Sequence, residues 1–213
     1  MNVNDNNQIT VQGRIIGTPD YSHSVGAERF LKGIIKVTRT SGQADMLPFM
    51  VSERLAPDWT LGDGDVVVLI GQIRSNNVFN AAYGRSHLEV FLFVREISHE
   101  AVLAFPESDK NPSSTMNNVS LTGRLCKVPT YRVTPFGREI SDMMIAVERA
   151  FGKSDYIPCI AWGRTAKYAS TLKIGDAVKI EGRFQSRKYT KVFTDGKAEE
   201  RTVFEVSVFE LYA

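Results

Sequence analysis

The sequence predicts an all-β protein built from two copies of one small barrel, and two observations support this prediction. First, the segment from Val11 to Ile15 returns 110 residues later as the segment from Leu121 to Leu125, and Leu47-Pro48-Phe49 returns at the same interval as Ile157-Pro158-Cys159. Second, apolar and polar residues alternate through both halves of the chain, which is typical of strands with one buried face. A repeat of this length indicates a duplicated domain and not a solenoid.

The composition is that of an ordinary globular chain with two cores. Its 213 residues, of which 43% are hydrophobic, make two domains of about a hundred residues each. Cys126 and Cys159 both lie in the second half among apolar neighbours, which favours buried free thiols in a reducing compartment. The first residues lack the apolar core of a signal peptide, and no segment is apolar for long enough to span a bilayer. We therefore expect a cytoplasmic protein.

The charge is divided unevenly between the two halves. Residues 1–110 carry 10 Lys and Arg against 13 Asp and Glu, whereas residues 111–213 carry 16 against 11. The segment 105–117 is rich in Pro, Ser and Asn, so we expect an N-terminal domain over 1–104, a linker over 105–117 and a C-terminal domain over 118–213. The basic excess predicts a polyanionic partner for the second domain, although an unevenly charged, solvated surface would also explain it.

The elements of the second copy follow in a recognisable order. Alternation predicts five strands, and one short helix fits between the third and the fourth. Gly123 and Gly182 interrupt strand patterns and indicate bulges or sharp bends, and Asp195-Gly196 marks a hairpin tip. The expected strands are Val119 to Leu125, Met143 to Phe151, Tyr156 to Trp162, Ala177 to Arg187 and Phe204 to Leu211, and the expected helix is Thr165 to Leu172. This is the layout of an OB-fold, a Greek-key barrel, and the first copy repeats the order.

Aromatic and cationic residues share the outer face of this barrel. In the third strand, Ile157, Cys159 and Ala161 point to the core, so Tyr156 and Trp162 point outward together. In the fourth strand the core face holds Val178, Ile180, Gly182 and Phe184, which leaves Lys179, Glu181, Arg183, Gln185 and Arg187 outside. Rings that stack on bases, interleaved with cations that follow phosphates, are typical of proteins that bind single-stranded nucleic acid. The alternative is that Trp162 packs under a loop and that Tyr189 only completes the hairpin.

The second copy resembles a known family in several motifs at once. The motifs are Gly123-Arg124-Leu125, the turn with Pro129, Arg132, Pro135 and Gly137, Trp162-Gly163-Arg164 with Ala166, Gly175-Asp176, and the run from Ile180 to Tyr189. In this combination the second copy resembles the bacterial single-stranded-DNA-binding protein family over nearly its whole length.

Position by position, this resemblance implies a DNA site. The residues at the family's base-stacking positions are Tyr156, Trp162, Tyr189 and Phe151, and those at its backbone-contact positions are Arg132, Lys173, Arg183, Arg187 and Lys188. The resemblance further implies a sheath for single-stranded DNA in replication, recombination or repair, located at the bacterial nucleoid, with little sequence preference.

The first copy keeps the frame of the family but lacks its aromatic rings. The positions that correspond to the stacking residues hold Met46, Ser52, Val78 and Ser41. Phe79 and Tyr83 lie in the neighbouring hairpin and could replace the missing rings. The segments 66–70 and 90–94 are apolar on both faces and need a cover. We therefore expect the first domain to have a degenerate ligand face and to serve in assembly, packed against the second domain or against another chain.

The resemblance also implies an assembly of four OB-folds, which two copies of this chain would supply as a homodimer. The sequence ends at Ala213 without the acidic tail through which family members recruit replication and repair proteins. Replication or repair proteins remain candidate partners, but we expect no recruitment through a tail and no membrane partner.

Three classes of function are compatible with a chain of this fold. The leading one is non-enzymatic binding and protection of single-stranded DNA. The second is a protein-interaction module of a replication-restart complex, similar to primosomal replication protein N; exposed Tyr156, Trp162 and Tyr189 rings favour the first class and buried rings the second. The third, an enzyme, needs a carboxylate cluster or a metal site, but the three histidines lie in the first copy and both cysteines in the second. We expect no catalytic residues, no metal and no cofactor.

Overall fold

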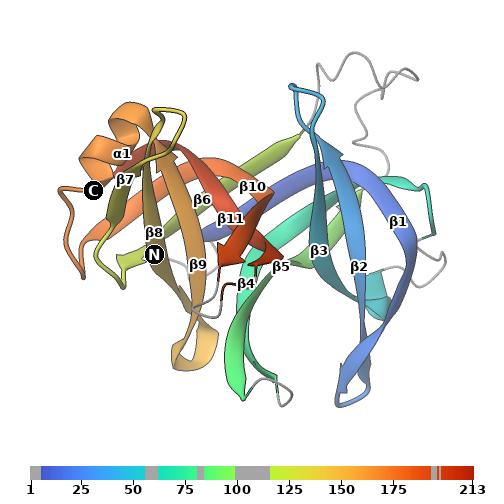
Figure 1. The fold of residues 1–213 in the computed structure, drawn as a ribbon. Coiled ribbons are helices and arrows are strands. Elements are labelled where there is room, and N and C mark those ends of the chain that lie inside the picture. Colours follow the sequence, from blue (N-terminus) through green and yellow to red (C-terminus); the bar gives the residue numbers. More distant parts are fainter. Residues whose placement is uncertain (1–5, 56–61, 81–83, 99–115, 193–195, 197) are drawn as a thin grey trace.

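Two β-barrels lie side by side in the computed structural model of the chain (Figure 1). The structure describes residues 6–55, 62–80, 84–98, 116–192, 196 and 198–213. The first barrel consists of β1 (Asn7–Val25), β2 (Glu28–Thr38), β3 (Ala44–Ser52), β4 (Val66–Asn80) and β5 (Arg85–Ser98). The second consists of β6 (Asn117–Leu125), β7 (Thr130–Val133), β8 (Glu139–Arg149), β9 (Lys153–Trp162), β10 (Ala177–Val192) and β11 (Ala198–Tyr212).

The predicted all-β fold of two OB-type barrels is confirmed. In the second barrel, β6 and β7 together take the place of the long strand β1: β6 pairs with β10 and β7 with β8, as the two halves of β1 pair with β4 and β2. All five predicted strands are present and longer than expected, and β7 is an additional strand that was not predicted. Strand β8 ends at Arg149 and not at Phe151, because Phe151 lies in the turn before β9. Strand β8 begins at Glu139 because its first residues pair with β7, and β10 and β11 continue as a paired arm to Val192 and Ala198.

The segment expected to be the linker lies almost wholly outside the described residues. Strand β6 begins at its last residue, Asn117, whose side-chain amide donates to the Phe184 carbonyl at 2.7 Å and accepts from the Phe184 N–H at 2.9 Å. Asn117 is therefore fixed to the second barrel. The hairpin tip expected at Asp195 also lies outside the described part of the chain.

A short helix lies between β9 and β10, as predicted, but with different ends. Helix α1 spans Gly163–Ala169 instead of Thr165 to Leu172. The N–H groups of Thr171 and Leu172 bond to carbonyls three residues back, so the last turn tightens and leaves the α-helical pattern. The first barrel has the 3-10 helix η1 (Glu53–Leu55) at the corresponding place, and residues 56–61 after it are not described. A second 3-10 turn, η2 (Ala150–Gly152), joins β8 to β9.

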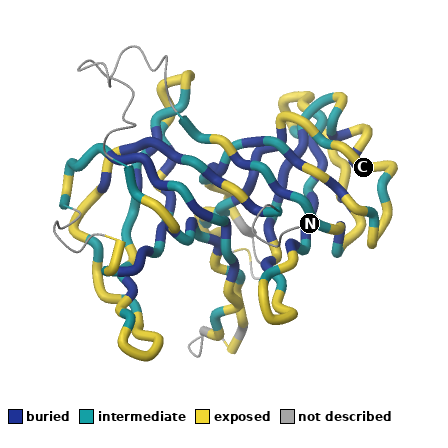
Figure 2. Tube along the Cα trace, turned by 180° about the vertical axis from the view of Figure 1, so that it is seen from behind, coloured by how far each residue is buried: buried dark blue, intermediate teal, exposed yellow. Residues whose placement is uncertain are grey.

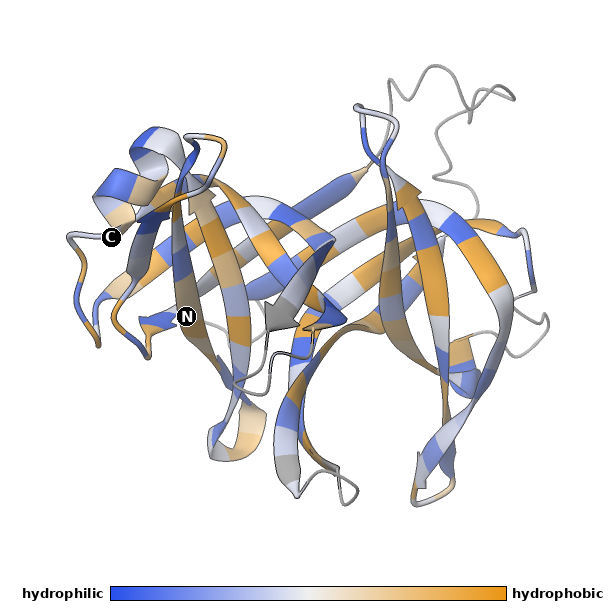
Figure 3. Ribbon diagram, in the orientation of Figure 1, coloured by the Kyte–Doolittle hydropathy of each residue, from blue (hydrophilic) through white to orange (hydrophobic). Residues whose placement is uncertain are grey.

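The cores form as the alternation predicts. Ile157, Cys159 and Ala161 are buried under β10, where Ile180 and Phe184 are fully buried in turn. Figure 3 shows hydrophobic and hydrophilic residues alternating along the strands, and Figure 2 shows that exposure concentrates in the hairpin ends and loops. The side chains that face away from these cores are therefore the candidates for function.

Two glycines allow the strands to turn the corners of the second barrel. A register shift between β10 and β11 lies at Glu181/Gly182, which confirms the bulge predicted there. A Cβ atom on Gly182 would collide with the Ser207 carbonyl, and one on Gly123 would collide with the Ala146 carbonyl. Arg124, the next residue, pairs with both β10 and β8, so Gly123 serves a close approach of two backbones.

The two barrels are joined through their first strands. Strands β1 and β6 pair antiparallel, with Ile9 opposite Val119, and these two residues occupy the same position in the two repeats. All eleven strands therefore belong to one continuous sheet. The junction has the character of an isologous dimer interface, in which the same surface patch is used by both partners. Within this chain, the first barrel packs against the second.

Candidate nucleic-acid interface

Strand β9 presents two of the predicted rings on the outer face of the second barrel. The Tyr156 side chain is 43% exposed, and Trp162 is half-buried with its indole N–H donated to Ser207 Oγ at 3.2 Å. Ile160, between them on the same face, is buried. The hydrogen bond to Ser207 fixes the orientation of the indole, so Trp162 is a partly covered ring and Tyr156 an accessible one.

Phe151 occupies an unusual backbone position at the turn between β8 and β9. Its side chain is 97% exposed, and its φ of 63° lies in the left-handed region, where it is the only non-glycine residue in the described chain. An L-residue in this region is destabilised by roughly 1–2 kcal/mol relative to the right-handed one. An apolar ring that is both exposed and held in a costly conformation is an indication of a functional site.

Tyr189 lies on the arm formed by β10 and β11. Its ring is 40% exposed, and its Cα partner across the arm is Arg201, which forms an ion pair with Glu199 at 2.9 Å. Tyr156, Tyr189 and Phe151 are thus exposed on β9, on the β10 arm and on the turn before β9. The structure places all four predicted stacking residues on the second barrel, three of them accessible.

A charge network forms the floor between these rings. Arg187 donates two hydrogen bonds to the Glu205 carboxylate, at 2.8 and 2.9 Å, and Gln185 donates a third at 3.1 Å. Glu205 is only 3% exposed. These hydrogen bonds raise the pKa of Arg187, and the negative charge of Asp142 acts in the same direction. The negative charge of Glu205 therefore balances the positive charge of Arg187, and this buried carboxylate fixes the position of the guanidinium.

The other predicted cations differ in the groups that they contact. Arg183 stacks over the Phe209 ring with its guanidinium carbon 5.6 Å from the centroid, and burial lowers its pKa. Arg132 forms an ion pair with Asp142 at 2.9 Å. Lys188 is paired with Glu200 at 2.8 Å on the surface, and the hydrogen bond raises its pKa. Arg132, Arg187 and Lys188 are thus each paired with a carboxylate, and the Lys188 side chain is the most exposed of the three.

Lys173 does not join this group. It lies in the turn before β10, where its backbone N–H donates to Asp176 at 2.8 Å. Arg187 lies ten residues beyond Ala177, the first residue of β10, so Lys173 lies beyond the opposite end of this strand. The predicted rings and the other four cations lie on β7, β9, β10 and the turn before β9, and Lys173 lies apart from them.

Phe136 is the most exposed of the second-barrel rings that the sequence prediction missed. Phe136 is 91% exposed at the tip of the hairpin between β7 and β8, next to Arg138. Pro135 and Gly137 on either side of Phe136 predict a tight, exposed turn. An aromatic ring at the centre of such a turn is not needed for packing, and this could have marked Phe136 as a candidate site residue.

The first barrel carries its aromatic rings elsewhere. Phe93 on β5 is flanked by Arg74 and Arg95, whose guanidinium carbons lie 5.2 and 5.0 Å from the ring centroid. Of the positions that correspond to the stacking residues, Met46 is exposed and Ser52 is buried, bonded to Glu28 at 2.5 Å. Phe93 belongs to the segment 90–94, which is apolar on both faces and was therefore expected to need a cover.

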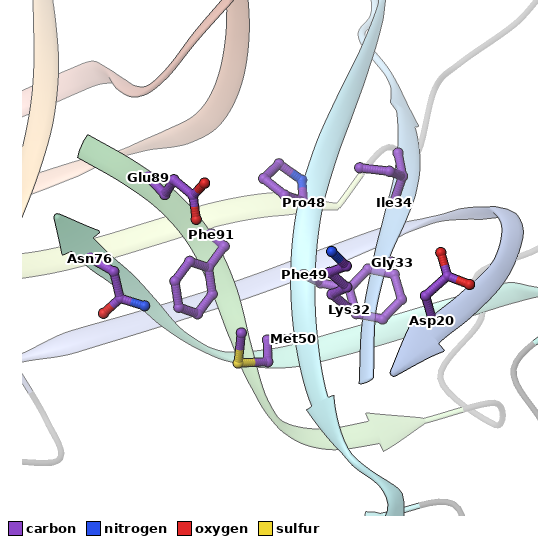
Figure 4. Close-up of a pocket in the computed structure, with 10 residues that line it drawn as sticks. All are labelled: Asp20, Lys32, Gly33, Ile34, Pro48, Phe49, Met50, Asn76, Glu89 and Phe91. Carbon is purple, nitrogen blue, oxygen red and sulfur yellow. The ribbon is translucent and has the colours of Figure 1, made fainter. Parts of the chain in front are cut away.

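A shallow hollow lies on the outer face of the first barrel. Figure 4 shows the Phe91 ring and Asn76 on one side of it and Lys32 and Asp20 on the other. Phe79, suggested as a substitute ring, is exposed on the neighbouring arm, and Tyr83 lies outside the described residues. The residues around the hollow are Asp20, Lys32, Gly33, Ile34, Pro48, Phe49, Met50, Asn76, Glu89 and Phe91.

Other kinds of site find little support in the described part of the chain. Among these residues no group of three His, Cys, Asp or Glu side chains is close enough to hold a metal ion. Cys159 is buried beside Glu205, and burial raises the pKa of its thiol, which disfavours the reactive thiolate. No described helix is both long and apolar enough for a membrane span.

Comparison with known proteins agrees with this geometry. Residues 116–212 match the Single-strand binding protein family. The chain is 38% identical over 89 residues to single-stranded DNA-binding protein 2 of Listeria innocua, covering 38% of this chain and 55% of that protein, and 40% identical over 81 residues to the single-stranded DNA-binding protein of Bacillus cereus, covering 35% and 48%. It therefore spans about half the length of these curated relatives.

The fold comparison extends over both barrels. The crystal structure of the wild-type single-stranded DNA binding protein from Thermus aquaticus superposes with a TM-score of 0.70 at 22% identity, covering 97% of this chain and 91% of that one. At this identity the similarity establishes the two-barrel fold alone.

Proposed function

We propose that this protein binds single-stranded DNA with little sequence preference, because residues 116–212 match the Single-strand binding protein family. The observation that carries the proposal is the accessibility of Tyr156, Tyr189 and Phe151 around one charged face. Every base has a π-face, so stacking on such rings contributes roughly 1–3 kcal/mol per base without reading the sequence. An exposed ring in a strained backbone position, as at Phe151, supports a binding role more than a packing role.

In this proposal the residues have distinct roles. Tyr156, Tyr189 and Phe151 stack on bases, and Trp162 offers a fixed ring edge beside them. Arg132, Arg187 and Lys188 contact phosphates, either by releasing their carboxylate partners or by binding carboxylate and phosphate at once. Arg183, at the edge of the face, contacts a further phosphate. Lys173 would contact only DNA that extends around the barrel. Salt should weaken binding strongly, because phosphate contacts release counterions.

The first barrel has a supporting role in this proposal. Its positions equivalent to the stacking residues hold Met46 and Ser52, and its first strand pairs with that of the second barrel. Two chains would supply four barrels as a homodimer. The protein would act without catalysis in replication, recombination or repair, in the bacterial cytoplasm at the nucleoid. The alternative, a protein-interaction module of a replication-restart complex, is disfavoured by the accessible rings.

Tryptophan fluorescence tests the proposal. Titration with unlabelled oligothymidine should quench the parent protein, because a base approaching the ring edge changes the surroundings of Trp162. The quenching should weaken at high salt and largely disappear in Trp162→Phe, while fluorescence anisotropy of a labelled oligothymidine still reports binding. Absence of binding by the parent at low salt would overturn the proposal.

A further inference from the structure

The first barrel is hydrogen-bonded to the strand that carries Tyr156. The Ser75 backbone N–H on β4 donates to Asp155 Oδ1 at 2.9 Å, and the Tyr156 backbone N–H donates to Ser75 Oγ at 2.7 Å. Both bonds lie in a buried part of the interface between the barrels. A single serine of the first barrel thus holds two successive residues of the second, at the base of the turn that carries Phe151.

The carboxylate in this contact is deeply buried and paired. Asp155 is 1% exposed, and its oxygens lie 3.4 Å from Arg149 Nη1 and 3.7 Å from Arg74 Nε. One of these arginines belongs to each barrel. A buried carboxylate held by two cations and a backbone N–H resists displacement, so the base of the β8–β9 turn is anchored to the first barrel.

The same contact occurs a second time with the barrels exchanged. Asp45 Oδ1 of the first barrel accepts from the backbone N–H and from Oγ of Ser186 on β10, at 2.8 and 3.0 Å. Arg39 donates two hydrogen bonds to Asp45 and one to the Ser186 carbonyl at 3.1 Å. Asp45 and Asp155, Arg39 and Arg149, and Ser75 and Ser186 are corresponding residues of the two repeats. The bond from the serine N–H to the aspartate is therefore repeated in both copies, whereas the serine hydroxyl accepts from Tyr156 in one copy and donates to Asp45 in the other.

These two clamps end on the elements that carry the accessible rings. The Ser75 contact fixes Tyr156 and the base of the Phe151 turn, and the Asp45 contact fixes Ser186, next to Arg187 and three residues before Tyr189. We propose that Ser75 and Asp45 of the first barrel are positioning residues for the DNA face of the second barrel. This inference rests on the proposed function.

The physical basis is preorganisation. Rings on a turn and on a two-stranded arm lose conformational freedom when a base stacks on them, and this loss weakens binding. Anchoring the base of each element from the neighbouring barrel removes part of the loss before DNA arrives. The first barrel would then strengthen DNA binding by the second without touching the strand itself.

The test uses Ser75→Ala in the full chain. This change removes the acceptor of the Tyr156 N–H and leaves the Ser75 N–H bonded to Asp155. We expect the Kd for a labelled oligothymidine to rise roughly three- to tenfold, the range of one lost hydrogen bond. Ser186→Ala, which removes the second clamp's hydroxyl, should act in the same direction. The matched control is Ser120→Ala, which removes a bond from Oγ to Glu181 at 3.0 Å on β6 and should leave the Kd unchanged.

A double-mutant cycle separates positioning from general damage. If Ser75 acts partly through Tyr156, the Ser75→Ala effect on Kd should be clearly smaller in a Tyr156→Ala background, where only the contribution through the Phe151 turn remains. Amide hydrogen exchange of residues 149–156 in the free protein should also speed up in Ser75→Ala and not in Ser120→Ala. Unchanged Kd in Ser75→Ala, or an equal loss in both backgrounds, would overturn the inference.

The two proposals can fail separately. If the parent does not bind oligothymidine, the proposed function fails and the positioning role falls with it. If the parent binds and exchange of residues 149–156 is unaffected by Ser75→Ala, the function stands and the positioning role is wrong.

Discussion

The two barrels differ in what their last strands place on the outer face. In the first barrel, β5 pairs with β3 so that Leu92 lies beside Phe49 in the core, and Phe91 and Phe93 face outward. In the second, β11 pairs with β9 so that Val206 lies beside Cys159, and the outward positions hold Glu205 and Ser207. The same frame therefore supports an aromatic floor in one barrel and a polar floor in the other.

The polar floor explains how the second barrel organises its face. Glu205 holds Arg187, and Ser207 holds the indole of Trp162. With these groups fixed at the centre, the accessible rings lie around them, on the turn, on β9 and on the arm. In the first barrel Phe93 instead stacks against Arg74 and Arg95. A duplicated domain can thus diverge in its binding surface while its core and its interface stay symmetric.

The largest expected effect comes from removing two rings of the second barrel together. Tyr156→Ala with Tyr189→Ala should raise the Kd for oligothymidine at least about thirtyfold, because each stacked base contributes roughly 1–3 kcal/mol and 1.4 kcal/mol corresponds to a factor of ten. Fluorescence anisotropy measures this. Met46→Ala, at the position of Tyr156 in the first barrel, is the control and should change the Kd less than twofold. An equal increase in Kd in the two variants would show that the two barrels do not differ in DNA binding.

A second prediction concerns the polar floor. Glu205→Ala should lower the free energy of unfolding by about 2 kcal/mol, because Arg187 and Gln185 lose the acceptor they share and Arg187 is only partly exposed to water. Urea unfolding followed by circular dichroism measures the change. Glu200→Ala, which breaks the exposed pair with Lys188, should leave the unfolding midpoint in place. A Glu205 variant as stable as the parent would show that the floor is not held by this carboxylate.

A third prediction separates binding from stability at Phe151. Phe151→Gly should raise the free energy of unfolding by about 0.5 kcal/mol, since relief of the left-handed conformation outweighs the larger chain entropy of glycine. The same change should weaken DNA binding about fivefold. Thermal unfolding and anisotropy report the two effects. Ser41→Gly, at the corresponding turn of the first barrel, should not weaken binding, and a stable Phe151→Gly protein with full affinity would contradict the stacking role.

The smallest expected effect concerns one exposed cation. Lys188→Gln should reduce the slope of log Kd against log salt by about 0.7, the value for one phosphate contact with a single strand. Titrations at four salt concentrations measure the slope. Lys173→Gln, near the other end of the barrel, should leave the slope for a short oligothymidine unchanged. An identical loss for both lysines would mean that the DNA wraps around the whole barrel.

The sequence was sufficient for features that depend on local pattern. The alternation around Ile157 and Cys159 gave the faces of β9, and Gly182 gave the bulge, because both are properties of one strand. The placement of Tyr156 and Trp162 on one face followed from the same alternation. The repeat interval located the corresponding residues of the two barrels.

Features that depend on contacts between distant segments were not predicted. The Arg187–Glu205 pair depends on the register of β10 and β11, which the bulge at Gly182 shifts. The left-handed conformation of Phe151 depends on how tightly η2 turns between paired strands. The Ser75 and Asp45 clamps join residues from different barrels, and although the repeat keeps these residue types in both copies, it does not show that they meet across the interface.

The central claim is that single-stranded DNA lies on the rings of the second barrel. Ultraviolet crosslinking of the parent protein to oligothymidine, followed by mass spectrometry of the crosslinked peptides, tests it most directly. We predict crosslinks at Phe151, Tyr156 and Tyr189. Crosslinks confined to the first barrel, at Phe91 or Phe93, would contradict the account.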